Sequence, residues 1–105
     1  MTQKTTTLAD QAATVAALTL LISGHRDLPA LNVGFNAIFP TELALSLHNQ
    51  PGAFDAWMAA IAPKGAEVRE STQADGRTRV RRARFPYAGV DIQLDDYATD
   101  QEEAS

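Results

Sequence analysis

Two glycine-containing turns in the second half of the chain constrain its fold more than any other feature. Asp75-Gly76 and Ala88-Gly89 separate three strand-like segments near residues 65–73, 77–86 and 89–97, and such dipeptides favour tight hairpins. When the hairpins are centred on these turns, one face of the sheet collects the apolar side chains of Ala66, Val68, Ala83, Phe85, Ile92 and Leu94. Because both turns give the same buried face, the sequence predicts a three-stranded antiparallel meander.

A helix is predicted directly before this meander. Its large apolar residues recur at i, i+3, i+4 and i+7, as Phe54, Trp57, Met58 and Ile61, which is the spacing of a helix with one buried face. Pro51 suits the first helical turn, with Asn49 or Gln50 before it as the cap. Pro63 ends the helix.

A first helix is predicted over residues 7–23. Thr7 and Asp10 have the spacing of a capping box, and Gly24 follows the last turn. The face expected to be buried carries Leu8, Ala12, Val15, Leu18 or Thr19, and Ile22. Leu20 and Leu21 widen the apolar surface, so this helix is expected to be covered on more than one side, and a second subunit could supply the extra cover.

Between the helices the apolar period changes from 3.6 to 2, which predicts two strands. Residues 31–39 and 43–47 alternate apolar with other residues, and a three-residue connection over 40–42 keeps the apolar faces together. That connection pairs Phe39 with Leu43 and Phe35 with Leu47. The alternative is a short helix over residues 41–48, and the strict alternation of three leucines favours the strand.

Together these elements predict an α+β fold in the order α-β-β-α-β-β-β. We expect an antiparallel sheet of about five strands, with both helices on one face. Residues 7–97 form the single domain, residues 1–6 a flexible N-terminus and residues 98–105 an acidic, disordered tail.

Catalysis, metal binding and cofactor binding find no support in the sequence. The chain has no cysteine, which excludes thiolate sites and disulfides. Its two histidines, His25 and His48, have no metal ligand at a suitable spacing, and Ser46 beside His48 has no third group to form a triad. No phosphate-binding or nucleophile-elbow motif is present. We therefore predict a non-enzyme without a cofactor.

The predicted compartment is the cytoplasm, without membrane attachment. The longest apolar run, residues 15–22, is too short to span a bilayer. A signal peptide over residues 1–24 is disfavoured, because Asp10 and Gln11 interrupt the start of its apolar core. The absence of cysteine fits a reducing environment.

An arginine-rich strand over residues 77–84 is the most suggestive feature for function. It supplies the candidate partner-binding residues Arg77, Arg79, Arg81, Arg82 and Arg84, with Tyr87 close behind. One hypothesis is a nucleic-acid contact strip, but the net charge of −4 argues against it. The predicted register also places Arg84 opposite Glu67 and Gln93, Arg82 opposite Arg69 and Asp95, and Arg81 opposite Glu70, as in ordinary cross-strand pairs.

The hairpin that carries this strand becomes polar toward Asp75-Gly76, so we expect it to project from the core as an arm. Projecting hairpins and open sheet edges commonly bind other proteins. The acidic residues between Asp91 and Glu103 are interpreted as a solubilising stretch.

Residues 52–61 (GAFDAWMAAI) and 87–97 (YAGVDIQLDDY) resemble segments of small, uncharacterised proteins of actinobacteria and their phages. The resemblance covers about the last half of the chain and implies a cytoplasmic accessory protein, such as a phage-related modulator of a host protein. It implies no site residues. The leading functional hypothesis is a non-catalytic protein that binds another protein and forms a homodimer; the alternative is a nucleic-acid binder using the arginine strand.

Overall fold

The computed structural model describes residues 6–99. Its elements follow the predicted order. They are η1 (Leu8–Gln11), a 3₁₀ helix, α1 (Ala12–Gly24), β1 (Asn32–Phe35), β2 (Glu42–His48), α2 (Ala53–Ile61), β3 (Val68–Thr72), β4 (Thr78–Tyr87) and β5 (Val90–Thr99). The strand β5 runs two residues past the predicted domain end, so residues 98 and 99 are not part of a disordered tail as predicted. Of the predicted flexible segments 1–6 and 98–105, residues 1–5 and 100–105 lie outside the described residues. None of the helices within residues 6–99 combines the length and apolarity needed to cross a bilayer.

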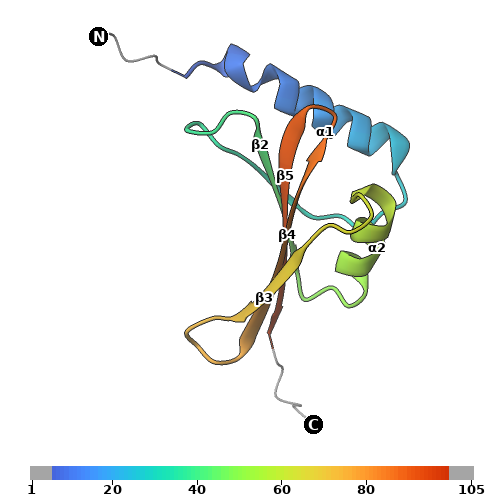
Figure 1. Ribbon diagram of the computed structural model, residues 1–105, viewed down its shortest axis with the longest axis vertical. Coiled ribbons are helices and arrows are strands. Elements are labelled where there is room, and N and C mark those ends of the chain that lie inside the picture. Colours follow the sequence, from blue (N-terminus) through green and yellow to red (C-terminus); the bar gives the residue numbers. More distant parts are fainter. Residues whose placement is uncertain (1–5, 100–105) are drawn as a thin grey trace.

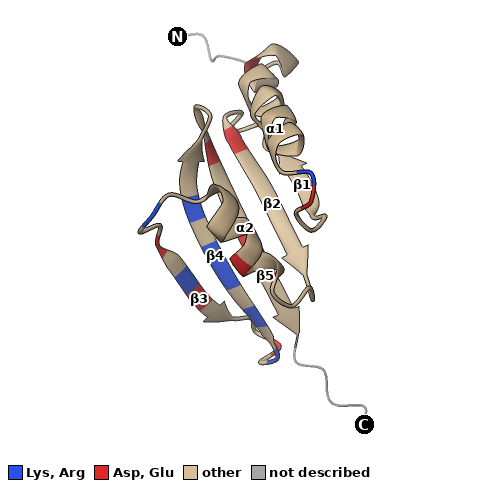
Figure 2. Ribbon diagram, turned by 90° about the vertical axis from the view of Figure 1, so that its right-hand side faces the viewer, with Lys and Arg blue, Asp and Glu red and all other residues tan. Residues whose placement is uncertain are grey.

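The five strands form one mixed sheet in the order β1-β2-β5-β4-β3. Both helices lie on the same side of it (Figure 1), with α1 toward the β1 edge and α2 over the middle (Figure 2). The prediction of a purely antiparallel sheet is wrong at one place, because β2 and β5 pair in parallel. After β2 the chain passes through α2 to the opposite edge, and the meander then returns β5 to the centre in the direction of β2.

The predicted register of the meander is confirmed from Val68 onward. The predicted position of Arg84 opposite Glu67 is not part of the ladder, because β3 begins at Val68, and Val68 is exposed although it was predicted on the buried face. Val68 lies opposite Ala83, Ala83 opposite Leu94, and Phe85 opposite Ile92. At the first turn the backbone N–H of Gln73 donates to the carbonyl of Thr78 over 2.8 Å, so the connection has four residues centred on the predicted Asp75-Gly76.

Asp75 holds this connection together. Its carboxylate accepts the backbone N–H groups of Arg77 (2.8 Å) and Thr78 (2.9 Å) and the Thr78 hydroxyl (2.7 Å). These hydrogen bonds, first of all the one from the Arg77 backbone, lower the pKa of Asp75. Because the charged carboxylate is the better acceptor, the turn is held best above the normal titration range of aspartate and loosens as the pH falls.

The second turn is the two-residue turn predicted at Ala88-Gly89. Both residues have positive φ, 50° and 85°, as a type I′ hairpin turn requires. Glycine adopts this backbone without strain, whereas alanine does so at a steric cost.

Replacing Ala88 with asparagine is therefore expected to stabilise the protein by about 0.5–1 kcal/mol, since asparagine tolerates the left-handed region far better. Thermal unfolding followed by circular dichroism should give a midpoint several degrees higher, roughly 4 °C. Ala88→Val, which adds a β-branch at the same φ, is the matched control and should lower the midpoint. An unchanged midpoint in both variants would show that the backbone of Ala88 is not strained.

The first hairpin differs from its predicted form. Phe35, not Phe39, lies opposite Leu43, so the strand stops early and the predicted pairing of Phe35 with Leu47 is wrong. The cause is Asn36, whose Oδ1 accepts the backbone N–H groups of Ile38 (2.8 Å) and Phe39 (3.1 Å) and bends the chain into a loop. The observed register of β1 against β2 differs from the predicted one by an even number of residues, so the apolar side chains of the two strands still lie on the same face of the sheet.

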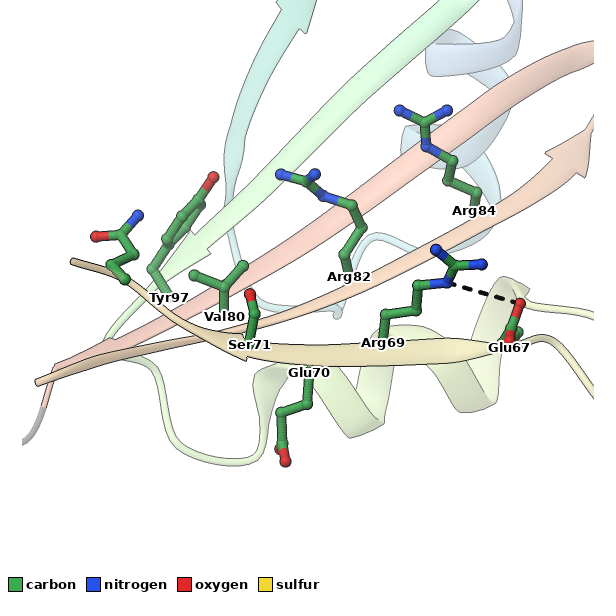
Figure 3. Close-up of a pocket in the computed structure, with 9 residues that line it drawn as sticks. Glu67, Arg69, Glu70, Ser71, Val80, Arg82, Arg84 and Tyr97 are labelled. Atoms are coloured by element: carbon green, nitrogen blue, oxygen red, sulfur yellow. Dashed lines mark ion pairs between the residues drawn. The ribbon is translucent and has the colours of Figure 1, made fainter. Parts of the chain in front are cut away.

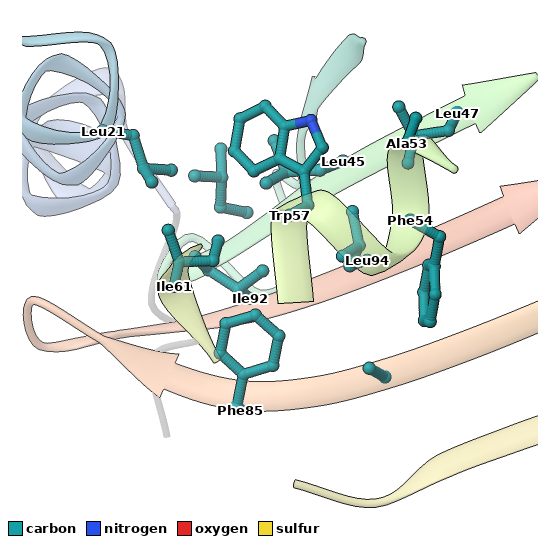
Figure 4. Close-up of a cluster of buried hydrophobic side chains, with 12 residues drawn as sticks. Leu21, Leu45, Leu47, Ala53, Phe54, Trp57, Ile61, Phe85, Ile92 and Leu94 are labelled. Atoms are coloured by element: carbon teal, nitrogen blue, oxygen red, sulfur yellow. The ribbon is translucent and has the colours of Figure 1, made fainter. Parts of the chain in front are cut away.

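The core lies between the helices and the central strands (Figure 4). It is built from Leu21, Leu43, Leu45, Leu47, Ala53, Phe54, Trp57, Ile61, Ala83, Phe85, Ile92 and Leu94. The predicted apolar face of α2 is confirmed, with Met58 partly buried at its border. The helix begins later than predicted, because Gly52 caps it with a φ of 79° and Pro51 lies in the preceding turn.

The buried face of α1 is not the predicted one. Thr14, Ala17 and Leu21 are buried, and the Thr14 hydroxyl donates to the carbonyl of Pro40. On the predicted face, Leu18 is half-buried and the others are exposed: Leu8, Ala12, Val15, Thr19 and Ile22. The capping box at Thr7 and Asp10 is present. Since α1 is apolar on several faces, periodicity alone does not select the one that meets the sheet.

Candidate partner-binding surface

The arginines predicted to bind a partner do not form one site. Successive residues of β4 point to opposite faces of the sheet, so Arg82 and Arg84 lie on the open face, whereas Arg79 and Arg81 lie on the face that carries the helices. Arg77 lies in the β3–β4 turn, which is away from both helices in Figure 1. Tyr87 is partly buried against the core.

Arg81 joins three elements. Its guanidinium forms ion pairs with Asp96 of β5 (3.0 Å) and Asp55 of α2 (3.4 Å), and it stands over the ring of Phe54 at 4.5 Å. Asp96 is buried, so this ion pair compensates a carboxylate that water scarcely reaches. Arg81 lies opposite Glu70 in the strand register, as predicted, whereas its ion pairs are formed with Asp96 and Asp55. The side chain of Arg81 ties the sheet to α2.

Arg82 is held in a network on the open face. Its Nε and a terminal nitrogen donate to the buried carboxylate of Asp95 over 2.7 and 3.3 Å. That carboxylate also accepts Gln93 Nε2 (3.0 Å) and the Tyr97 hydroxyl (3.4 Å). The hydrogen bonds from Arg82 to Asp95 raise the pKa of the guanidinium, and burial opposes them. Arg82 is thus the partner of Asp95, as the predicted register required.

A groove of about 740 Å³ runs along the open face beside β3 and β4. Figure 3 shows Arg69, Arg82 and Arg84 rising from its floor, and Glu70 pointing to the opposite side of β3. Arg69 is 4.0 Å from Glu67, and Arg84 donates to Gln93. With Arg82 paired to Asp95, the groove offers little uncompensated positive charge, which weakens it as a phosphate-binding site.

The two histidines lie apart from any metal-binding arrangement. His48 is exposed and stacks on Tyr97, with ring centroids 4.9 Å apart and planes 8° from parallel. Within residues 6–99 no three metal-ligating side chains come together, and every buried side-chain polar atom in that part of the chain has a hydrogen-bond partner.

A second surface, which the sequence analysis did not single out as a site, lies at the opposite side of the sheet. We call it the uncharged edge: the large apolar residues Leu8, Val15, Ile22, Val33, Phe35, Ile38 and Phe39, from 40% to 82% exposed. They come from η1, α1, β1 and the β1–β2 loop. Val15 and Ile22 are seven residues apart, so they lie on one side of α1, and Leu8 belongs to η1 directly before it.

Two hydrogen bonds fix the loop against the helix. Gln11 Nε2 donates to the carbonyl of Asn36 over 3.5 Å, and Thr14 donates to that of Pro40. Around a helix of 100° per residue, Gln11 lies between Thr14 and Val15. The loop that carries Ile38 and Phe39 is therefore next to the side of α1 that carries Val15.

The sequence signal for this surface is an absence of charge. No Asp, Glu, Lys or Arg occurs in residues 11–24 or in residues 28–41. In Figure 2 α1 and β1 are tan along their lengths, whereas β4 is banded with blue. A surface helix normally carries charged residues on its outer side, so α1 has the composition of a helix covered all round.

Comparisons with protein-family models, with curated proteins and with solved structures find no match to this chain.

Proposed function

We propose that this protein is a non-catalytic accessory protein that acts by binding another protein through the uncharged edge. The observation that carries the proposal is the grouping of seven large, exposed apolar side chains on neighbouring elements. Of these elements α1, β1 and the β1–β2 loop have no charged residue, and η1 has Asp10. Contiguous apolar patches of this kind mark interaction surfaces on soluble proteins.

Covering one half-exposed Leu, Ile or Phe side chain recovers about 1 kcal/mol. Covering several such side chains therefore contributes more binding free energy than an exposed ion pair on the arginine strand, because a surface ion pair contributes about 0–1 kcal/mol. The surface with the larger available free energy of binding is the uncharged edge.

Nucleic-acid binding by residues 77–84 is the weaker alternative. The arginines are divided between two faces of the sheet, and Arg81 and Arg82 already have carboxylate partners. Phosphate binding relies on cations that face one polyanion together.

An affinity pull-down tests the proposal. The tagged protein is used as bait in a lysate of the cells that make it, with and without nuclease, and captured proteins, untagged copies of the chain included, are identified by mass spectrometry. We expect capture that survives nuclease and is lost with the double variant Val15→Glu, Ile22→Glu. Leu20→Glu is the matched control, since Leu20 is equally exposed on the opposite side of α1, and it should keep the partner.

The opposite result would be capture that disappears with nuclease and persists in the double variant. In that case the arginine strand, and not the uncharged edge, carries the function.

A further inference from the structure

We infer that the occupant of the uncharged edge is a second copy of this chain, joined through antiparallel pairing of the two β1 strands. The inference rests on the proposed function and specifies its partner. Three observations support it: the difference between the two edge strands, the glycine in β1, and the area of the exposed apolar surface.

The two edges of the sheet differ in how they are protected. Natural sheets guard an open edge with charged side chains, which resist pairing with another strand. The edge strand β3 carries Arg69 and Glu70 in five residues, whereas β1 reads Asn-Val-Gly-Phe. The β3 edge is therefore protected by charged side chains and the β1 edge is not, as expected if β1 pairs with another strand in the assembled protein and β3 does not.

Gly34 in the middle of β1 has no explanation inside one chain. A Cβ placed on it would lie 3.7 Å from Ala44 Cβ, an ordinary contact, and its φ is not in the left-handed region. A glycine weakens a strand by about 0.5–1 kcal/mol relative to alanine. Strand glycines often mark the close approach of another backbone, and a two-fold axis at Gly34 supplies one.

That axis makes the interface self-complementary. Antiparallel pairing about Gly34 places Val33 of each copy opposite Phe35 of the other, on the face of the sheet that carries α1. Aromatic and β-branched cross-strand pairs are among the favourable ones. In an isologous interface the same patch serves both subunits. Because α1, β1 and the β1–β2 loop have no charged residue, no like charges of these elements face each other.

The available area also fits. At their exposed fractions, the seven side chains offer roughly 700 Å² per copy, which is close to the about 800 Å² per partner of a specific interface. The other exposed large apolar residues, Leu20 and Val68, lie on the far side of α1 and on the guarded edge.

The first test is the mass of the purified protein by light scattering on a sizing column. We expect twice the 11.3 kDa of one chain. Ile38→Glu, in an exposed loop where the fold is not at risk, should halve the mass, and Val68→Glu on the β3 edge should leave it unchanged. Circular dichroism confirms that each variant is folded.

The second test uses the absence of cysteine. Paired antiparallel strands hold opposite Cα atoms about 4.5–5.5 Å apart, within the range of a disulfide. Gly34→Cys should therefore give a covalent dimer on mild oxidation, and Ser71→Cys on β3, the matched control, should not.

A dimer that persists in Ile38→Glu and does not cross-link through Gly34→Cys would overturn the inference. A wild-type protein that is monomeric at micromolar concentrations would overturn it as well. The pull-down tests the proposed function separately. The proposed function stands if the wild type captures another protein and the double variant Val15→Glu, Ile22→Glu does not. If no protein is captured, the proposed function and the inference both fail.

Discussion

Replacing Trp57 with alanine is expected to lower the free energy of unfolding by about 3–5 kcal/mol. Trp57 is buried in the core cluster, and its Nε1 donates to the carbonyl of Pro29 over 2.9 Å. It therefore fills the space between α2 and the sheet and also fixes the segment that leads into β1. A small domain has a net stability of only about 5–15 kcal/mol, so much of the variant should be unfolded at moderate temperature.

Urea unfolding followed by circular dichroism measures this loss. Trp57→Phe is the control, because it keeps most of the apolar volume and removes the hydrogen bond; its loss should be about 1–2 kcal/mol. A Trp57→Ala variant within about 1 kcal/mol of the wild type would show that α2 is not the main cover of the sheet.

Arg81→Met is expected to lower the free energy of unfolding by about 3 kcal/mol, more than either neighbouring arginine on β4. The change leaves the buried Asp96 without its cation and removes the contacts of Arg81 with Asp55 and Phe54. Arg82→Met should cost about 1–2 kcal/mol, because Gln93 and Tyr97 still donate to Asp95. Arg84→Met, on an exposed side chain, should lie within about 0.5 kcal/mol of the wild type.

Adding Asp96→Asn to Arg81→Met should recover part of the loss, since the amide leaves no buried charge. The free energies of unfolding of the single and double variants, measured with denaturant, form a double-mutant cycle that tests this. Equal losses for the three arginines would mean that Arg81 is not a structural link, and would return it to the set of residues available to a partner.

The meander was predictable because the residues that determine its strand register lie close to its turns in the sequence. Asp75-Gly76 and Ala88-Gly89 each fix one register within a few residues of the turn, and the predicted face is buried on β4 and β5. On the edge strand β3 the prediction of a buried Val68 is wrong, since that side chain is exposed. The pairing of β2 with β5 was not predictable in the same way. Leu43, Leu45 and Leu47 present the same alternation to a parallel and to an antiparallel neighbour, so their pattern carries no direction.

The first helix shows a different limit. A stripe at helical spacing was visible, but α1 is apolar on several sides. The side that meets the sheet carries Thr14, Ala17 and Leu21, and Thr14 donates to a loop distant in sequence. The stripe through Val15 and Ile22 is real and points away from the core. On the arginine strand the strand pairings were predictable, whereas the contacts of Arg81 with α2 depend on how the helix packs.

The parallel pairing of β2 with β5 also has a consequence for the order of folding. The central strand of the sheet is the last one in the chain, and Leu45 and Leu94 become neighbours only when it has formed. The edge of β2 that pairs with β5 therefore stays open while the rest of the chain is synthesised. Contacts so distant in sequence close slowly, and we expect refolding to be limited by the arrival of β5 between two hairpins, with the nascent chain most prone to self-association before that step.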